Sequence, residues 1–222
     1  MNVGVNGMHG IGMTSLRTRQ RLIQRLRAAG IANESVLQVM LNTPRHLFVE
    51  EALASRAYED TALPIGFGQT ISQPYIVALM TASLLEYRRP SRVLEIGTGC
   101  GYQTAVLAPF VGQLFSVERV GKLLDRARGR LRSLGLHNIR LKYDDGHLGW
   151  PRYAPFDGIL VTAAAREIPS ALLDQLAVGG RLVAPIGSSY DQDLVCVERK
   201  TVGFEKRILC PVSFVPLLGG VL

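Results

Sequence analysis

The chain has 222 residues, of which 47% are hydrophobic and 19% charged, with 25 Lys and Arg against 18 Asp and Glu. This length suits one α/β domain with a single large core, and the composition excludes disordered, collagen-like and coiled-coil proteins. No stretch reaches the roughly 18–20 consecutive apolar residues of a membrane span, and the glycine-rich start lacks the apolar core of a secretion signal. We expect a cytoplasmic protein without a membrane partner.

Cysteine content and charge narrow the class further. Three widely spaced cysteines (Cys100, Cys196 and Cys210) and four histidines predict neither a disulfide framework nor a metal site. The formal charge of +7 favours encounters with polyanions, and five arginines crowd the segment 17–27. That segment also carries a helical apolar stripe and lacks the aromatic residues of a single-strand binder. We therefore interpret the arginines as a solvated helix face and expect no nucleic-acid partner.

The first part of the chain is predicted to contain a flexible start, residues 1–15, and then helices and one ordered loop within residues 16–87. The loop, residues 57–74, has repeated glycine and proline breaks and no hydrophobic period. N-cap residues and helix-stopping residues delimit three predicted helices. The first spans 16–29, the second is capped by Asn33 or Ser35 and runs to about Leu41, and the third spans 75–87.

From residue 88 onward, short apolar runs alternate with helical stretches. The runs predict strands at Val93–Ile96, Leu114–Val117, Ile139–Leu141, Ile159–Thr162 and Arg181–Ile186, and a terminal hairpin at Leu194–Glu198 and Lys206–Val212. The stretches between them predict helices at Tyr102–Phe110, Lys122–Leu134 and Pro169–Leu176. This alternation predicts an α/β fold in one domain, 1–222: a doubly wound, mostly parallel, Rossmann-like sheet with a C-terminal antiparallel hairpin and an N-terminal helical segment.

A glycine-rich loop follows the first predicted strand of this core. Gly97, Gly99 and Gly101 let the backbone turn tightly and a ligand approach closely at the start of a helix. A dinucleotide-binding Gly-x-Gly-x-x-Gly would need glycine where the chain has Tyr102. Gly-x-Gly-x-Gly with an acid, Glu95, two residues ahead instead resembles motif I of class I S-adenosylmethionine-dependent methyltransferases.

Acidic residues end the next two strands. Glu118 is placed where a carboxylate accepts hydrogen bonds from ribose hydroxyls, and Asp145-Gly146 where a carboxylate can bind an adenine amino group. Each acid alone is common turn chemistry, but together they predict a nucleoside pocket at the carboxyl edge of the sheet. The end of the fourth strand, Val161–Ala165, lacks the Asn/Asp-Pro-Pro-Tyr signature of exocyclic-amine methylation, and no Pro-Cys nucleophile is present.

Further motifs resemble one methyltransferase family across most of the chain. They are Pro44–Val49, Ala57–Asp60, Leu63–Gly66, Gln69–Pro74, Asp145-Gly146, Ala154–Asp157, Val161–Ala164, Leu173–Pro185 and Phe214–Leu217. Together with the glycine loop they are similar to the protein-L-isoaspartate (D-aspartate) O-methyltransferases. The resemblance implies methyl transfer from S-adenosylmethionine to the free α-carboxylate of L-isoaspartyl residues in damaged peptides and proteins, which are then repaired through a succinimide. It implies such peptides and proteins as substrates, and we expect a monomer.

The resemblance also implies the site residues. Ser72 is the catalytic residue beside the transferred methyl group, and its alternative role is to cap the helix that starts near Tyr75. The implied cofactor contacts are Thr70, Ile71 and Ser72 at the reactive side, Glu95, Gly97, Gly99 and Gly101 at the amino-acid end, Glu118 at the ribose, and Asp145 and Gly146 at adenine. Asp60 can order the Ser72 loop or serve as a plain turn residue.

Two alternatives stay open at this point. One is a class I methyltransferase of RNA or a small metabolite, which fits the charge and the glycine loop but leaves the Gln69–Pro74 match unexplained. The other is a nucleoside-sensing or nucleic-acid-binding module without turnover, suggested by the arginines of residues 17–27. Salt-sensitive RNA binding without methyl transfer would select the second.

Overall fold

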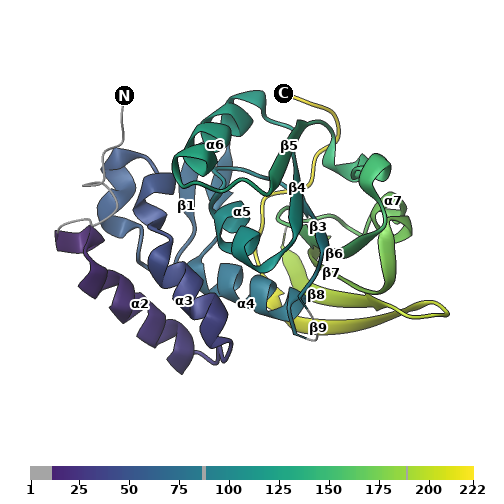
Figure 1. Cartoon of the computed structure of the whole chain (residues 1–222), viewed down its shortest axis with the longest axis horizontal. Helices are drawn as coiled ribbons and strands as arrows, with labels where there is room; N and C mark the ends of the chain where they lie inside the picture. The colour runs from purple at the N-terminus through teal and green to yellow at the C-terminus, as the bar shows by residue number, and fades with distance from the viewer. Residues whose placement is uncertain (1–11, 87–88, 189) are drawn as a thin grey trace.

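A computed structural model describes residues 12–86, 89–188 and 190–222. Seven strands form one mixed sheet in the order β5-β4-β3-β6-β7-β8-β9, with helices on both faces (Figure 1). The strands are β3 (Arg92–Ile96), β4 (Gln113–Glu118), β5 (Ile139–Tyr143), β6 (Phe156–Val161), β7 (Leu176–Ser188), β8 (Asp191–Arg199) and β9 (Phe204–Val212). The helices are α2 (Leu16–Ala28), α3 (Glu34–Asn42), α4 (Pro74–Leu84), α5 (Tyr102–Leu107), α6 (Gly121–Ser133) and α7 (Ser170–Asp174). Short 3-10 helices span Gly12–Thr14, Arg45–Phe48, Glu51–Arg56, Ala108–Phe110, Gly146–Leu148 and Pro151–Tyr153. This is the predicted α/β fold.

Strand β3 lies at the centre of the sheet, in parallel with β4 on one side and β6 on the other. Its last four residues are buried because both faces of the sheet are covered, which is why the sequence reads as a continuous apolar run. Val93 packs in a cluster with α4, whereas Leu94 and Ile96 pack in the cluster that contains Leu172 of α7. The carboxyl end of β3 therefore opens at an edge flanked by helices on both sides.

Helices α2 and α3 form an outer layer beside α4 and α5 (Figure 1). The apolar stripe of α2 is buried as its periodicity predicts. Arg17, Arg21, Arg25 and Arg27 of this helix are exposed, which confirms the predicted solvated face for four of the five arginines. The prediction is wrong for Arg19, which is buried. At the surface Arg25 donates to the carbonyl of Tyr58, and Arg27 binds both carboxylate oxygens of Glu34.

The segment 57–74 also differs from its prediction. In place of a loop without regular structure it contains an antiparallel hairpin, β1 (Leu63–Gly66) and β2 (Gln69–Ile71). The hairpin has three register pairs and one irregularity, too few for a hydrophobic period to be visible.

At the other end of the chain, β7 and β8 are antiparallel as well, and the predicted helix 169–176 is shortened to α7. The predicted flexible start lies largely outside the described residues, as does Tyr87 at the predicted end of α4.

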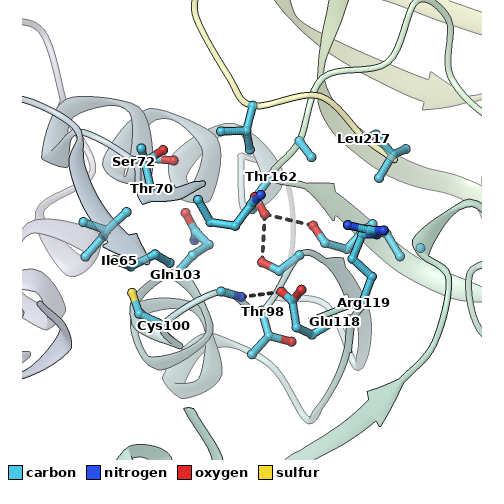
Figure 2. Close-up of a pocket in the computed structure, with 18 of the residues that line it drawn as sticks. Ile65, Thr70, Ser72, Thr98, Cys100, Gln103, Glu118, Arg119, Thr162 and Leu217 are labelled. Atoms are coloured by element: carbon cyan, nitrogen blue, oxygen red, sulfur yellow. Dashed lines mark hydrogen bonds between the residues drawn. The ribbon is translucent and has the colours of Figure 1, made fainter. Parts of the chain in front are cut away.

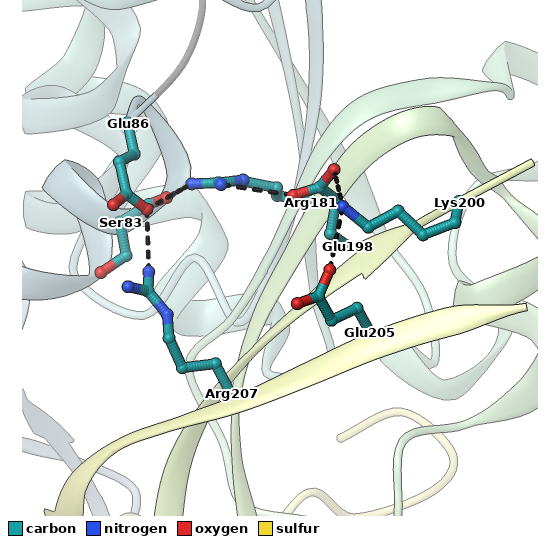
Figure 3. A network of polar contacts seen from close by, with 7 residues as sticks. All are labelled: Ser83, Glu86, Arg181, Glu198, Lys200, Glu205 and Arg207. Carbon is teal, nitrogen blue, oxygen red and sulfur yellow. Dashed lines mark hydrogen bonds and ion pairs between the residues drawn. The ribbon is translucent and has the colours of Figure 1, made fainter.

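A network of ion pairs connects the end of α4 with the antiparallel strands (Figure 3). The Arg181 guanidinium, whose side chain is 8% exposed, donates to Glu86 Oε2 at 2.6 Å and to Glu198 Oε2 at 3.3 Å. Arg207 binds the same Glu86 oxygen at 2.8 Å. The hydrogen bond from Arg181 lowers the pKa of Glu86, and the hydrogen bond from Lys200 lowers that of Glu198.

We expect Glu86→Gln to lower the free energy of unfolding at neutral pH by about 1–2 kcal/mol. The loss is limited because Arg181 still has its ion pair with Glu198 and because Glu86 is partly exposed to solvent. Because the folded-state pKa of Glu86 is lowered, its stabilisation is present above the unfolded value of 4.5 and disappears as the pH falls further. Urea titrations of both proteins between about pH 3 and pH 7 measure this difference. Glu205→Gln, whose side chain is 70% exposed, is the control and should change little. Equal loss in both variants would contradict a special role for Arg181.

Candidate functional site

A cavity of about 830 Å³, including the part open to solvent, lies at the carboxyl ends of β3, β4 and β6 (Figure 2). This is the edge at which open α/β sheets bind ligands. Its walls come from the β1–β2 hairpin, the glycine loop, the end of β4, the turn after β6, and the chain segment 215–218. In Figure 2 Thr70 and Ser72 lie on one side of the cavity and Glu118, Arg119 and Leu217 on the other.

Gly97 and Gly99 of the glycine loop line the floor of the cavity, whereas Gly101, also predicted as a cofactor contact, lies outside the lining, where a Cβ would meet Ala127 and Leu131 of α6. Gly97, Gly99 and Gly101 all have positive φ, and a Cβ on Gly97 would lie 2.3 Å from Thr162 Oγ1. The Thr162 hydroxyl donates to the carbonyls of Ile96 and Gly97, so the turns after β3 and β6 are joined. A Cβ on Gly146 would lie 2.4 Å from Ile96 Cγ2, which shows how closely the turn after β5 packs on the same strand. The space above Gly97 and Gly99 suits the part of a nucleoside-containing cofactor that packs directly against the loop backbone.

Glu95 does not line the cavity but lies buried beneath the glycine loop. Its Oε2 accepts hydrogen bonds of 2.6 Å from Thr104 of α5 and Ser116 of β4, and Ser116 is also bonded to Thr98 of the loop. Oε1 is buried and has no protein partner among the described residues. Burial raises the pKa of Glu95 to about 7, against the opposing effect of the two hydroxyls. The carboxyl group thus connects the loop with α5 and β4.

Glu118 lines the cavity at the end of β4. Its Oε2 accepts from the amide of Gly99 at 2.7 Å and its Oε1 from the amide of Val120 at 2.8 Å. These bonds fix the carboxylate against the glycine loop and leave acceptor capacity on each oxygen, since a carboxylate has about four lone-pair sites. The position fits a pair of ribose hydroxyls.

Asp145 lies near the cavity but is engaged with the end of the chain. Its Oδ2 accepts from the amide of Gly220 at 2.7 Å, and its Oδ1 contacts the amide and ring of His147, a partner the sequence did not reveal. Desolvation alone would raise the pKa of Asp145, but the hydrogen bonds from Gly220 and His147 outweigh it and lower the pKa. Its neighbour Gly146 does line the cavity.

Arg119 is a cavity residue that sequence reasoning missed. Its side chain donates to the carbonyls of Gly220 and Gly219, and its backbone carbonyl accepts from the amide of Leu222. The segment that follows Leu217 is therefore tied to the end of β4. Nothing in the local sequence could reveal a contact between positions so far apart.

The predicted residues Thr70, Ile71 and Ser72 all line the cavity, on the strand and turn that precede α4. The alternative role of Ser72 as a helix cap is not realised. The N-cap of α4 is Gln73, which makes no side-chain hydrogen bond, and the amide of Tyr75 is bound at 2.8 Å by Asp60 Oδ1. Of the two roles left open for Asp60, this bond to the start of α4 favours the ordering of the Ser72 segment, and within the described part of the chain the Ser72 hydroxyl has no hydrogen bond of its own.

Comparisons with known proteins identify the family. Residues 17–222 match the sequence profile of the family described as Protein-L-isoaspartate(D-aspartate) O-methyltransferase (PCMT). The chain belongs to the PCMT family. It is 59% identical over 214 residues to the protein-L-isoaspartate O-methyltransferase of Xanthomonas axonopodis pv. citri, which covers 96% of this chain and 94% of the relative. It is 60% identical over 211 residues to that of Halorhodospira halophila, covering 95% and 96%.

Solved structures of the PCMT family agree with this fold. One with the same name has a TM-score of 0.82 at 30% identity and covers 90% of this chain and 66% of its own. The Plasmodium falciparum PCMT, solved in complex with S-adenosyl-L-homocysteine, has a TM-score of 0.78 at 29% identity and covers 90% and 98%. The chain is an enzyme that methylates L-isoaspartyl residues of damaged proteins, with S-adenosylmethionine as its methyl donor.

The buried Glu95 predicts a pH dependence of stability. Because its pKa in the folded state is raised to about 7, the group stabilises the fold fully below its unfolded pKa of 4.5, and this contribution is lost as the pH rises through about 7. Relative to Glu95→Gln, the ligand-free wild type should lose up to about 3 kcal/mol of unfolding free energy between about pH 5 and pH 8. Urea titrations across that range measure it, and parallel pH curves for the two proteins would contradict it.

Proposed function

We propose that methyl transfer takes place at the Ser72 side of the cavity, onto the free α-carboxylate of an L-isoaspartyl residue. S-adenosylmethionine, when bound, supplies an electrophilic methyl group on a sulfonium. The acceptor carboxylate has a pKa of about 3.5–4 and is ionised at neutral pH, so it needs no general base. This agrees with a cavity lining that includes no histidine among the described residues. The chain then acts mainly by positioning the reactants and excluding water.

The observation that carries this proposal is the free hydroxyl of Ser72. Because Asp60 binds the amide that starts α4, the serine is left to face the cavity without a partner among the described residues. The hydroxyl donates to one oxygen of the acceptor carboxylate and leaves the other oxygen free to attack. Ser72 is thus the proposed catalytic residue, and Thr70 and Ile71 form the cavity wall next to it.

The remaining cofactor contacts are also proposals. Gly97 and Gly99 supply a close backbone surface for the amino-acid end of the cofactor, and Glu118 accepts from its ribose. Gly101 acts indirectly, by letting the loop turn into α5. Gly146 gives adenine room beside Ile96. Asp145 can reach adenine only by sharing its carboxylate with Gly220, and Glu95 acts from beneath the loop through Thr98 and Ser116.

We further propose that residues 1–222 form one methyltransferase domain that works in the cytoplasm as a monomer and does not bind nucleic acid. The three cysteines are free, as in a reducing compartment. Arg19 is buried, and the exposed Arg25 and Arg27 each bind a group of the protein, so that part of the arginine cluster serves the fold. Strand β9 carries exposed charges at Glu205–Arg207, which disfavour edge-to-edge pairing of copies. Light scattering and RNA binding at two salt concentrations test these last two statements, and a dimer or tight RNA binding contradicts them.

The first experiment is transfer of labelled methyl from S-adenosylmethionine to matched peptides, one with L-isoaspartate and one with L-aspartate. We expect base-labile label on the isoaspartyl peptide alone, since a methyl ester is base-labile and an N-methyl group is not. No label on either peptide, with the cofactor still bound, would contradict the proposed acceptor and favour RNA or a metabolite.

The second experiment replaces Ser72. We expect Ser72→Ala to lower kcat by about 10- to 100-fold, as the loss of one preorganised donor does, with little change in affinity for S-adenosylhomocysteine. Ser72→Thr keeps a hydroxyl and should retain more activity than the alanine variant. Steady-state kinetics and calorimetry measure both effects, and an unchanged kcat in Ser72→Ala removes the residue from the mechanism.

A further inference from the structure

The tip of the β1–β2 hairpin carries a residue that its backbone disfavours. Phe67 has φ +55°, and with Gly68 at φ +67° it forms the two-residue turn between β1 and β2. Such turns favour Asn-Gly or Asp-Gly, because both central residues need positive φ. Phe67 is the only non-glycine residue with positive φ among the described ranges, and its side chain is 41% exposed. An exposed phenylalanine at this position calls for a compensating contact.

The compensating contact is made with α6. Lys122 Nζ lies 5.9 Å and Arg126 Cζ 5.7 Å from the centroid of the Phe67 ring. The two cations are one helical turn apart, so they approach the same ring from one face of the helix. Neither forms an ion pair within the part of the chain that the structure describes. The ring is therefore held by cation–π attraction to two neighbouring cations of α6.

The hairpin and α6, which lie side by side (Figure 1), belong to two walls of the cavity. The hairpin supplies Ile65 and Thr70 to one wall, and α6 starts directly after Glu118 and Arg119 on the other. The glycine loop lies between them, with Ile65 Cδ1 3.4 Å from the position of a Cβ on Gly99. Helix α6 is anchored by its buried residues, and the hairpin is anchored by the buried side chains of Leu63, Ile65 and Ile71. Phe67 at the hairpin tip lies outside this core, so the contact with α6 is what holds the tip in place.

We propose that Phe67, held against Lys122 and Arg126, is a positioning residue that latches the hairpin over the cofactor cavity and slows cofactor exchange. The inference rests on the proposed function, in that the cofactor occupies this cavity. The latch keeps the Thr70–Ser72 segment in place and limits the release of S-adenosylhomocysteine after each transfer. The ring itself need not touch the reacting atoms.

The test uses Phe67→Asn, which gives the turn its preferred Asn-Gly sequence while it removes the ring. We expect the ligand-free variant to be at least as thermally stable as the wild type, yet to release S-adenosylhomocysteine about tenfold faster in stopped-flow experiments. Phe67→Tyr keeps an aromatic ring and should restore slow release. The double variant Lys122→Gln/Arg126→Gln should release the product as fast as Phe67→Asn, and combining all three substitutions should add little.

Phe204→Asn is the matched control, because this exposed phenylalanine also contacts an arginine, Arg199, at 6.0 Å but lies on β9. It should leave the release rate unchanged. Wild-type release rates in Phe67→Asn and in Lys122→Gln/Arg126→Gln would overturn the latch. The latch would also be overturned if the only effect of these substitutions were a higher KM for acidic peptides, because the two cations would then act in substrate docking. Failure of the proposed function would be recognised independently, because the wild-type protein would then transfer no methyl group to the isoaspartyl peptide.

Discussion

The carboxyl group of Glu95 holds together the elements on which the cavity is built. It lies in the central strand without a cationic partner among its hydrogen-bond contacts, and two hydroxyls, from Thr104 of α5 and Ser116 of β4, converge on one of its oxygens. Ser116 is also hydrogen-bonded to Thr98, so the same network extends into the glycine loop. The hydrogen bonds to Oε2 fix the geometry of this buried group, while Oε1, buried without a protein partner among the described residues, adds a cost to keeping the carboxyl charged. The loop can therefore keep three glycines in positive φ without becoming loose.

The floor and the cover of the cavity differ in how they are held. The floor is part of the sheet and is fixed by Glu95, Glu118 and Thr162 through buried or half-buried hydrogen bonds. The cover consists of the hairpin on one side and segment 215–222 on the other, and it is held by contacts that reach the surface, at Phe67 and at Arg119. The latch proposed at Phe67 would let the hairpin tip open while the floor keeps its geometry, so that the enzyme could exchange its reactants in each cycle.

Sequence reasoning predicted the fold and the place of the cavity because those signals are local, and most of the predicted site residues line it, whereas Glu95, Gly101 and Asp145 do not. The glycine spacing, the buried central strand and the acids at strand ends each depend on a few neighbouring residues. The roles of those residues in binding and catalysis stay predictions. The sequence could not reveal contacts between residues that are far apart in the chain. These are the hydrogen bonds from Arg119 to Gly219 and Gly220, the hydrogen bond from the Gly220 amide to Asp145, and the hydrogen bond that anchors Arg19. The β1–β2 hairpin was missed because its strands are too short to show a period.

The close packing of Gly146 on Ile96 has a consequence for how the family varies. A Cβ at position 146 would collide with the γ-methyl group that β-branching places on Ile96, and the backbone of Gly146 is not in the left-handed region that would by itself demand glycine. The demand for glycine thus comes from the neighbouring strand. We therefore expect positions 96 and 146 to vary together, so that a relative with alanine at 146 lacks a β-branched residue at 96.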